Sequence, residues 1–214
     1  MWYYIFALVL IYLVDSFYQY NCGEVSRWFA LHFFVNLIIS SLAMSDVQMM
    51  LRNPASIADT DSQTVNITGA FAIGLHIYHA IFFKMTRMDV FHHVVFVFLC
   101  GPLAITRFPY RLLSGIYFIG TGLPGGMVYL SLCASKYKII TSLQQKWWNN
   151  VVDTYFRIPG GIACATGCYY LSCISPNPYT CLLIGFALYF NSCYFGNLAI
   201  RNYEYHKTCR HIPE

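Results

Sequence analysis

Long apolar segments follow one another along this chain, and they restrict how it can fold. Hydrophobic residues make up 57% of the 214 residues, and charged residues only 10%. A soluble domain carries about 25% charged residues, so this chain lacks the polar surface that a water-exposed fold needs. Backbone groups in a bilayer must satisfy their own hydrogen bonds, which leaves helices or a closed barrel. Because the segments are long and do not alternate as strands do, we predict an all-α integral membrane protein.

Seven segments are candidates for membrane-spanning helices, each near the roughly 20 residues that a bilayer requires. They fall at residues 2–20, 28–44, 67–84, 90–106, 112–134, 152–174 and 181–200. The first lacks the basic start and the small-residue cleavage site of a secretory signal, so we expect it to be retained as a span. The polar stretch 45–65 is expected to be a loop with a solvated tip at residues 59–62.

Basic residues in the connections predict the orientation of the chain. Nine of them follow the first, third, fifth and seventh spans: Arg27, Lys84, Arg87, Lys136, Lys138, Lys146, Arg201, Lys207 and Arg210. Only Arg52, Arg107 and Arg111 lie on the other side. Because positive residues stay cytosolic, we expect a lumenal N-terminus and a cytosolic C-terminus. The net charge of +4 is spread over these loops and does not suggest a nucleic-acid partner.

Five histidines lie in or beside the predicted spans, where an ionisable side chain is costly unless it has a partner or a function. His76 and His79 are three residues apart and share a helix face. His92 and His93 are adjacent near the start of the fourth span, and His32 lies in the second. A bond to a backbone carbonyl or to a neighbouring helix explains any one of them, but it explains the group less well.

Three further features lie in or beside the spans. Asp89 precedes His92 by three residues and is expected to hold that imidazole by a hydrogen bond. Asp153 and Arg157 are four residues apart, acid first, which is the spacing of an intrahelical ion pair. Pro124, inside a glycine-rich segment, is expected to kink the fifth span or break its regularity.

Neither the cysteines nor the histidines predict a metal site. The nine cysteines contain no CxxC motif and no cysteine–histidine pattern with zinc spacing. Membrane di-iron enzymes gather about eight histidines in boxes of the H-x-x-H-H kind. Only His76-x-x-His79 resembles such a box, so we expect no metal. Cys173 and Cys181 flank a short connector and can bridge only if their Cα atoms lie within about 7 Å. The usual spacing of adjacent helices, about 8–10 Å, favours two free thiols.

Six ordered pieces of sequence form a larger pattern. They are Ser26-Arg27 with Ala30-Leu31-His32, Asp46 through Arg52-Asn53-Pro54, Gly74 through His79, Asp89 with Phe91-His92-His93-Val94, Gly120 through Pro124, and Arg157. This pattern resembles the TLC domain, the membrane domain that ceramide synthases share with other TLC-domain-containing proteins. The resemblance covers about residues 24–205, and the paired histidines in their context are its most specific part.

The resemblance implies a particular architecture and setting. Residues 24–205 would form a TLC-type barrel-like bundle of six helices, with the span in residues 1–23 packed on its outside. Residues 206–214 would form a short basic cytosolic tail. The setting would be the endoplasmic reticulum or another endomembrane, and the partner a membrane lipid, with sphingolipids among the candidates. The oligomeric state does not follow from the resemblance.

Two departures from the family pattern bear on function. His79 replaces the aspartate of a G-Y-x-x-Y-D motif, and the fifth span lacks the carboxylates that ceramide synthases carry there. The chain is therefore more similar to the non-synthase members, which are associated with lipid composition and trafficking. We expect a protein of lipid metabolism, binding, sensing or trafficking, without a cofactor. The alternatives are an acyl-CoA-dependent N-acyltransferase and a scaffold without a ligand.

The candidate site residues are the polar side chains inside the spans, interpreted through the resemblance. Those expected to contact a ligand are His32, His76, His79, His93, Tyr117, Thr121 and Arg157. Under the acyltransferase alternative, His92 and His93 are the candidates for catalysis, because an imidazole can accept a proton from an attacking amine.

Overall fold

The computed structural model describes residues 2–209, and every regular element in that range is a helix. The α-helices are α1 (Trp2–Cys22), α2 (Arg27–Arg52), α3 (Thr64–Phe82), α4 (Arg87–His92), α5 (Cys100–Arg107), α6 (Leu112–Tyr117), α7 (Leu123–Lys136), α8 (Ser142–Val152), α9 (Ile158–Ser172) and α10 (Pro178–Cys209). A 3-10 turn, η1 (Pro54–Ala58), follows α2. Three π-helical segments, η2 (His93–Leu99), η3 (Phe118–Gly122) and η4 (Asp153–Arg157), join α4 to α5, α6 to α7 and α8 to α9. The predicted all-α class is confirmed.

Six helices in the described range are long and apolar enough to cross a membrane. They are α1, α2, α3, α10 and the continuous helices α4–η2–α5 and α6–η3–α7. The expected span at residues 152–174 lies in α8–η4–α9, which is not among the six. Its glycines and tyrosines and the Asp153–Arg157 pair make it less apolar than the others. A multi-pass membrane protein is therefore supported, and the seventh span stays a prediction.

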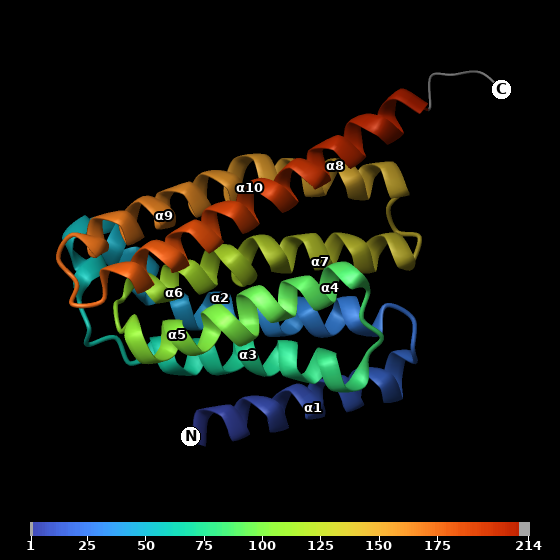
Figure 1. The fold of residues 1–214 in the computed structure, drawn as a ribbon. Coiled ribbons are helices and arrows are strands. Elements are labelled where there is room, and N and C mark those ends of the chain that lie inside the picture. Colours follow the sequence, from blue (N-terminus) through green and yellow to red (C-terminus); the bar gives the residue numbers. More distant parts are fainter. Residues whose placement is uncertain (1, 210–214) are drawn as a thin grey trace.

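The helices lie side by side and alternate in direction (Figure 1). The connections α1–α2, α3–α4 and α7–α8 lie at one end of the bundle, on the right in Figure 1, where α10 also ends. The connections α2–α3, α5–α6 and α9–α10 lie at the opposite end. Most of the loop arginines and lysines belong to the first end, which we call the basic end. The alternation that the loop charges predicted is thus present, and which end faces the cytosol stays a prediction.

Two clusters of buried apolar side chains hold the helices together. One joins α1, α2 and α3 and includes Ile11, Val35 and Phe71. The other joins α5, α6, α9 and α10 and includes Leu113 and Leu171. Both clusters combine side chains that are distant in sequence, so each stabilises the tertiary arrangement and not one helix alone.

Each composite helix carries a proline shortly after its π segment: Pro102, Pro124 and Pro159. A proline has no N–H and clashes with the carbonyl four residues earlier, and in all three helices that carbonyl belongs to the π segment. The wider turn shifts the bonding, so that the Leu123 amide donates to the carbonyl of Phe118, five residues back. The prediction that the regularity of the fifth span breaks at Pro124 is confirmed.

The helix α1 packs against α2 and α3 at the edge of the bundle (Figure 1). Its buried residues, Ala7, Ile11 and Asp15, are spaced four apart and form one stripe. Asp15 accepts hydrogen bonds from Arg27 at 2.6 and 2.8 Å and from the Tyr78 hydroxyl at 2.7 Å. A carboxylate of α1 therefore ties the start of α2 to α3.

The expected loop at residues 45–65 is partly helical, because α2 continues to Arg52. Asp46 is buried on α2 and accepts hydrogen bonds from three hydroxyls: Ser62 at 2.5 Å, Thr64 at 2.5 Å and Ser114 at 2.6 Å. Arg111 lies 3.3 Å from Asp46 and also pairs with Asp59 and Asp61, each at 2.6 Å. Asp59, Thr60 and Asp61 are exposed, so the expected solvated tip is confirmed, and its two aspartates tie it to the bundle by ion pairs.

Two smaller expectations concern the end of the chain and its cysteines. Helix α10 continues through Cys209, so the start of the predicted tail at residue 206 is helical, and residues 210–214 lie outside the described residues. Cys173 and Cys181 are both free thiols, as the spacing of adjacent helices favours.

Candidate functional site

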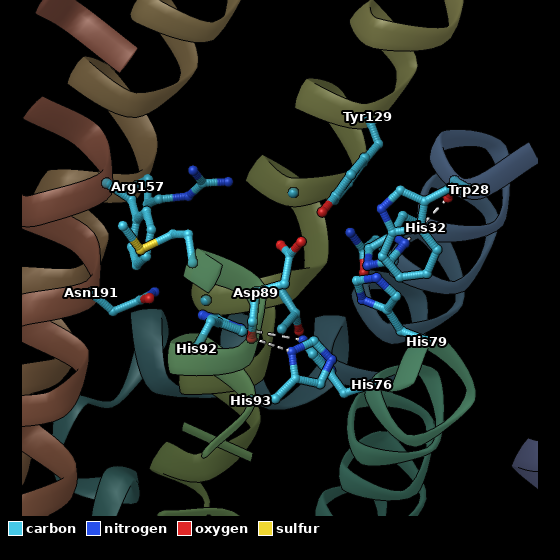
Figure 2. Close-up of a pocket in the computed structure, with 16 residues that line it drawn as sticks. Trp28, His32, His76, His79, Asp89, His92, His93, Tyr129, Arg157 and Asn191 are labelled. Atoms are coloured by element: carbon cyan, nitrogen blue, oxygen red, sulfur yellow. Dashed lines mark hydrogen bonds between the residues drawn. The ribbon is translucent and has the colours of Figure 1, made fainter. Parts of the chain in front are cut away.

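A cavity of about 230 Å³ lies within the bundle, and Figure 2 shows the side chains that line it. We call it the polar cavity. Residues from α2, α3, α4, η2, η3, α7, η4 and α10 line it, and all five of the predicted intramembrane histidines are among them. The cavity thus gathers polar side chains from most of the long helices, with α1 contributing none.

Helix geometry explains why the histidines meet. His76 and His79 share one face of α3, and His92 and His93 stand where α4 passes into η2. The ring centroid of His76 lies 5.4 Å from that of His92 and 5.2 Å from that of His93. His79 lies 4.9 Å from His93, and His32 on α2 lies 6.1 Å from His79. The five rings form one continuous cluster.

The backbone fixes the hydrogen-bonding role of three of these rings. The Nδ1 atoms of His32, His76 and His93 lie 3.2, 2.6 and 2.7 Å from the carbonyl oxygen four residues earlier in the same helix. A carbonyl only accepts, so each Nδ1 carries the proton and donates it. A neutral imidazole has one N–H, so the Nε2 atom of each ring presents a lone pair.

His92 takes the complementary role. Its Nε2 atom lies 3.4 Å from Nε2 of His76, which holds a lone pair, so His92 donates. The expected bond from Asp89 to His92 was wrong. The Asp89 carboxylate accepts from the Thr86 amide at 2.8 Å and from its hydroxyl at 2.7 Å, which caps the start of α4. Asp89 is the third residue of that helix, where a capping box draws an acidic side chain back to the cap.

Aromatic side chains close one side of the polar cavity. Trp28 packs on His79 with ring centroids 3.7 Å apart and reaches Phe83 at 4.9 Å. Tyr129 of α7 lies 4.2 Å from His32. Figure 2 shows Trp28, His32 and His79 together on this side. The rings of Trp28, His79 and Tyr129 form the wall of the polar cavity beside the start of α2.

Arg157 and Asn191 lie on the other side of the polar cavity (Figure 2). Arg157 pairs with Asp153 at 2.7 Å, which confirms the predicted intrahelical ion pair. The Nε atom of Arg157 and the side-chain oxygen of Asn191 are buried and have no partner within residues 2–209. These two groups are therefore available to a ligand.

A second cavity of about 130 Å³ adjoins the first. The two share five lining residues: His76, His92, Gly120, Thr121 and Asn191. Beyond them the second cavity is lined mostly by apolar side chains of η2, α5, α6 and α10, such as Phe96, Leu113 and Ile184. We call it the apolar cavity. The pair offers a polar space and a hydrocarbon-like space side by side.

The structure places most of the predicted site residues together. His32, His76, His79, His92, His93, Thr121 and Arg157 all line the polar cavity. Tyr117 lines only the apolar cavity. Whether these residues bind a ligand stays a prediction.

Sequence reasoning missed two residues that line the polar cavity on α2. Trp28 and Asn36 lie one helical turn before and after His32. The four-residue spacing along that helix face was the signal that would have found them. Asn36 is 2% exposed, and its side-chain oxygen has no partner among the described residues.

The described residues contain no group of three or more His, Cys, Asp or Glu side chains placed to hold a metal ion. The rings of His32, His76 and His93 instead use one nitrogen on the backbone and turn the other toward the cavity or a neighbouring ring. No family model, curated protein or solved structure matches this chain, so the resemblance to the TLC domain stays a prediction.

Proposed function

We propose that this chain is a multi-pass membrane protein that holds a membrane lipid inside its helix bundle. The head group occupies the polar cavity, and a hydrocarbon chain occupies the apolar cavity. The observation that carries the proposal is the junction of the two cavities at His76, His92, Gly120, Thr121 and Asn191. An amphiphilic molecule fits such a junction, because its polar part can lie in one cavity while its covalently attached apolar part lies in the other.

In the proposed function, the polar cavity determines which lipid is selected. Moving a hydrocarbon chain from lipid into an apolar cavity changes its surroundings little, since lipid tails are as apolar as leucine side chains. Hydrogen bonds to a buried head group, by contrast, satisfy protein groups that are otherwise unpaired. Contacts around the histidines therefore decide which lipid is held.

The ordered sequence pieces support a TLC-type setting for this function. In that setting seven helices span the membrane, the last six form the barrel-like bundle, and α1 packs outside it. The basic end faces the cytosol, so the N-terminus is lumenal and the C-terminus cytosolic. The protein acts in lipid binding, sensing or trafficking in the endoplasmic reticulum or another endomembrane.

The second candidate function is an acyl-CoA-dependent N-acyltransferase. The buried Nε2 atom of His93, which has a lone pair and no partner among the described residues, favours it. In such a reaction the amine nitrogen attacks the thioester carbon, the C–S bond breaks, and the imidazole takes the amine proton and passes it to the thiolate. The fifth span, α6–η3–α7, contains no carboxylate to assist, which ranks this function second.

Lipid mass spectrometry on the purified, extensively washed protein tests the proposal. The matched variants are Gly120→Leu and Ala163→Leu. A Cβ on Gly120 meets only Leu188 Cδ1, at 3.9 Å, so the larger side chain enters the junction of the cavities without a backbone clash. Ala163 lies on the exposed face of α9, so its variant adds the same kind of side chain outside the cavities.

The wild type and Ala163→Leu are expected to retain one class of intact lipid at a fixed ratio to protein, and Gly120→Leu to lose it. Equal retention by all three proteins would contradict the proposed location. A covalently attached acyl group or turnover of acyl-CoA would favour the transferase. A protein free of lipid would indicate the scaffold without a ligand.

A further inference from the structure

The histidines of the polar cavity are ordered with respect to hydrogen bonding, and this order restricts the head group. In His32, His76 and His93 the Nδ1–H is already used on the backbone. Only Nε2 is left for a ligand, and in a neutral imidazole with a protonated Nδ1 that atom can only accept. Nε2 of His76 accepts from His92, so His32 and His93 are the rings that face the ligand as acceptors.

His93 is the clearest case. Its residue is 3% exposed, and its Nε2 atom is buried without a partner in the described part of the chain. A doubly protonated ring would place both a charge and an unpaired N–H at this position, which a buried site does not tolerate without a partner. The ring is therefore neutral, and its lone pair is left for a donor that the protein itself does not supply.

The other buried atoms without a partner are also mostly acceptors. Among the residues that line the polar cavity, the buried atoms without a partner are Nε2 of His93, the side-chain oxygens of Asn36 and Asn191, and Nε of Arg157. Three of these four atoms are acceptors and one is a donor. Thr121 has already given its hydroxyl proton to the Tyr117 carbonyl at 2.8 Å. The lining also carries donors, in Arg157, Tyr129 and the amides of Asn36 and Asn191, which can meet the acceptor oxygens of a head group. The unpaired Nε2 of His93 is different, because only a donor on the ligand can satisfy it.

We propose that the lipid held here has a head group with an O–H or N–H donor that bonds to Nε2 of His93, and that a head group without donors binds more weakly. The proposal rests on the proposed function and specifies its ligand. Hydroxyl and primary ammonium groups both supply this chemistry. An ammonium would also be favoured by the Asp89 carboxylate, which lines the same cavity.

The test compares four probes with the same dodecyl chain and the same phosphate, bound to full-length protein in phosphatidylcholine nanodiscs. Dodecylphosphoethanolamine has three N–H donors, and dodecylphosphoglycerol has two hydroxyls. Dodecylphosphocholine has no donor, and the methoxyethyl ester has no donor and lacks the bulk of choline. Affinity is measured by competition against a fluorescent dodecyl probe.

At least one donor-bearing probe is expected to bind about tenfold tighter than both probes without donors, which corresponds to 1.4 kcal/mol. His93→Phe keeps a ring of similar size and removes the acceptor. It is therefore expected to lower the affinity for the donor-bearing probe and to leave the affinities for the two probes without donors unchanged. His206→Phe, at an exposed histidine of α10 outside both cavities, is the matched control and is expected to change nothing. If His93→Phe does not fold, His32→Phe removes an equivalent acceptor.

The outcomes separate this inference from the function on which it rests. Preference for the ethanolamine probe alone identifies an ammonium head group, and preference for the glycerol probe alone identifies a hydroxylated one. Equal affinity for all four probes, or a donor preference that survives both histidine variants, overturns the inference and leaves lipid holding intact. Failure of every probe to bind overturns the proposed function as well.

Discussion

Two aspartates with the same ion-pair distance are expected to contribute very differently to stability. Asp15 lies 2.6 Å from Arg27, and Asp61 lies 2.6 Å from Arg111. The side chain of Asp15 is 2% exposed, whereas that of Asp61 is 79% exposed. Replacing each by alanine therefore compares a buried carboxylate with an exposed one, while the type of partner and the ion-pair distance are the same.

Removing one partner of a buried pair costs about 3–5 kcal/mol of the free energy of unfolding, because the other charge stays behind. Arg27 is 17% exposed and keeps Glu24 at 3.2 Å, so it partly rehydrates and we expect the lower end of this range, about 3 kcal/mol, for Asp15→Ala. The Tyr78 hydroxyl also loses its acceptor. Asp61 is solvated, and Arg111 keeps Asp46 and Asp59, so Asp61→Ala is expected to cost about 0–1 kcal/mol.

The free energies of unfolding are measured in bicelles by titration with a denaturing detergent, with helix content followed by circular dichroism. Raising the salt concentration should reduce the small effect of Asp61→Ala and leave that of Asp15→Ala nearly unchanged, since buried pairs are screened less. Equal losses for the two variants, or a larger loss for Asp61→Ala, would show that α1 is not held by its buried carboxylate.

Three further predictions concern packing, topology and capping. Gly161→Ala places a Cβ 2.5 Å from Ser192 Cβ on α10, so it is expected to lower the free energy of unfolding by about 1–3 kcal/mol, and Ser192→Gly in the same chain should restore most of the loss measured by thermal unfolding. Single cysteines at Met85 and Thr60, in a cysteine-free background, are expected to react with an impermeant thiol reagent from opposite sides of the membrane; labelling from one side would refute the alternation of the helices. Thr86→Ala removes the cap of α4 and is expected to cost about 1 kcal/mol and to speed hydrogen exchange at the Asp89 amide, whereas unchanged exchange would mean that the cap is not formed.

Local spacing predicted those features that depend on one helix. The acid-first spacing of Asp153 and Arg157 gave their ion pair, and Pro124 gave the irregular turn in the fifth span. The three-residue spacing of His76 and His79 placed both on one face. Each of these follows from helix geometry and needs no knowledge of the neighbouring helices.

Features that depend on several helices did not follow from the sequence in the same way. The predicted role of Asp89 failed because its carboxylate accepts from the amide and the hydroxyl of Thr86, at 2.8 and 2.7 Å, and not from His92. Arg111 was counted only as a loop charge, because nothing local shows that three aspartates reach it. The apolar cavity, and with it the position of Tyr117, appears only when α5, α6 and α10 are placed against one another.

The π segments η2 and η3 have a consequence for how ligand preference can vary. Each separates the two halves of its helix: α4 and α7 line the polar cavity, whereas α5 and α6 line the apolar one. A π turn contains an extra residue and so shifts the 3.6-residue repeat of the helix. The half before it and the half after it can therefore present different faces to the two cavities. If the two cavities hold a lipid as proposed, substitutions in α5 and α6 would change the accepted chain length while the histidines keep their orientation. Head-group choice and tail choice would then be two separately adjustable traits.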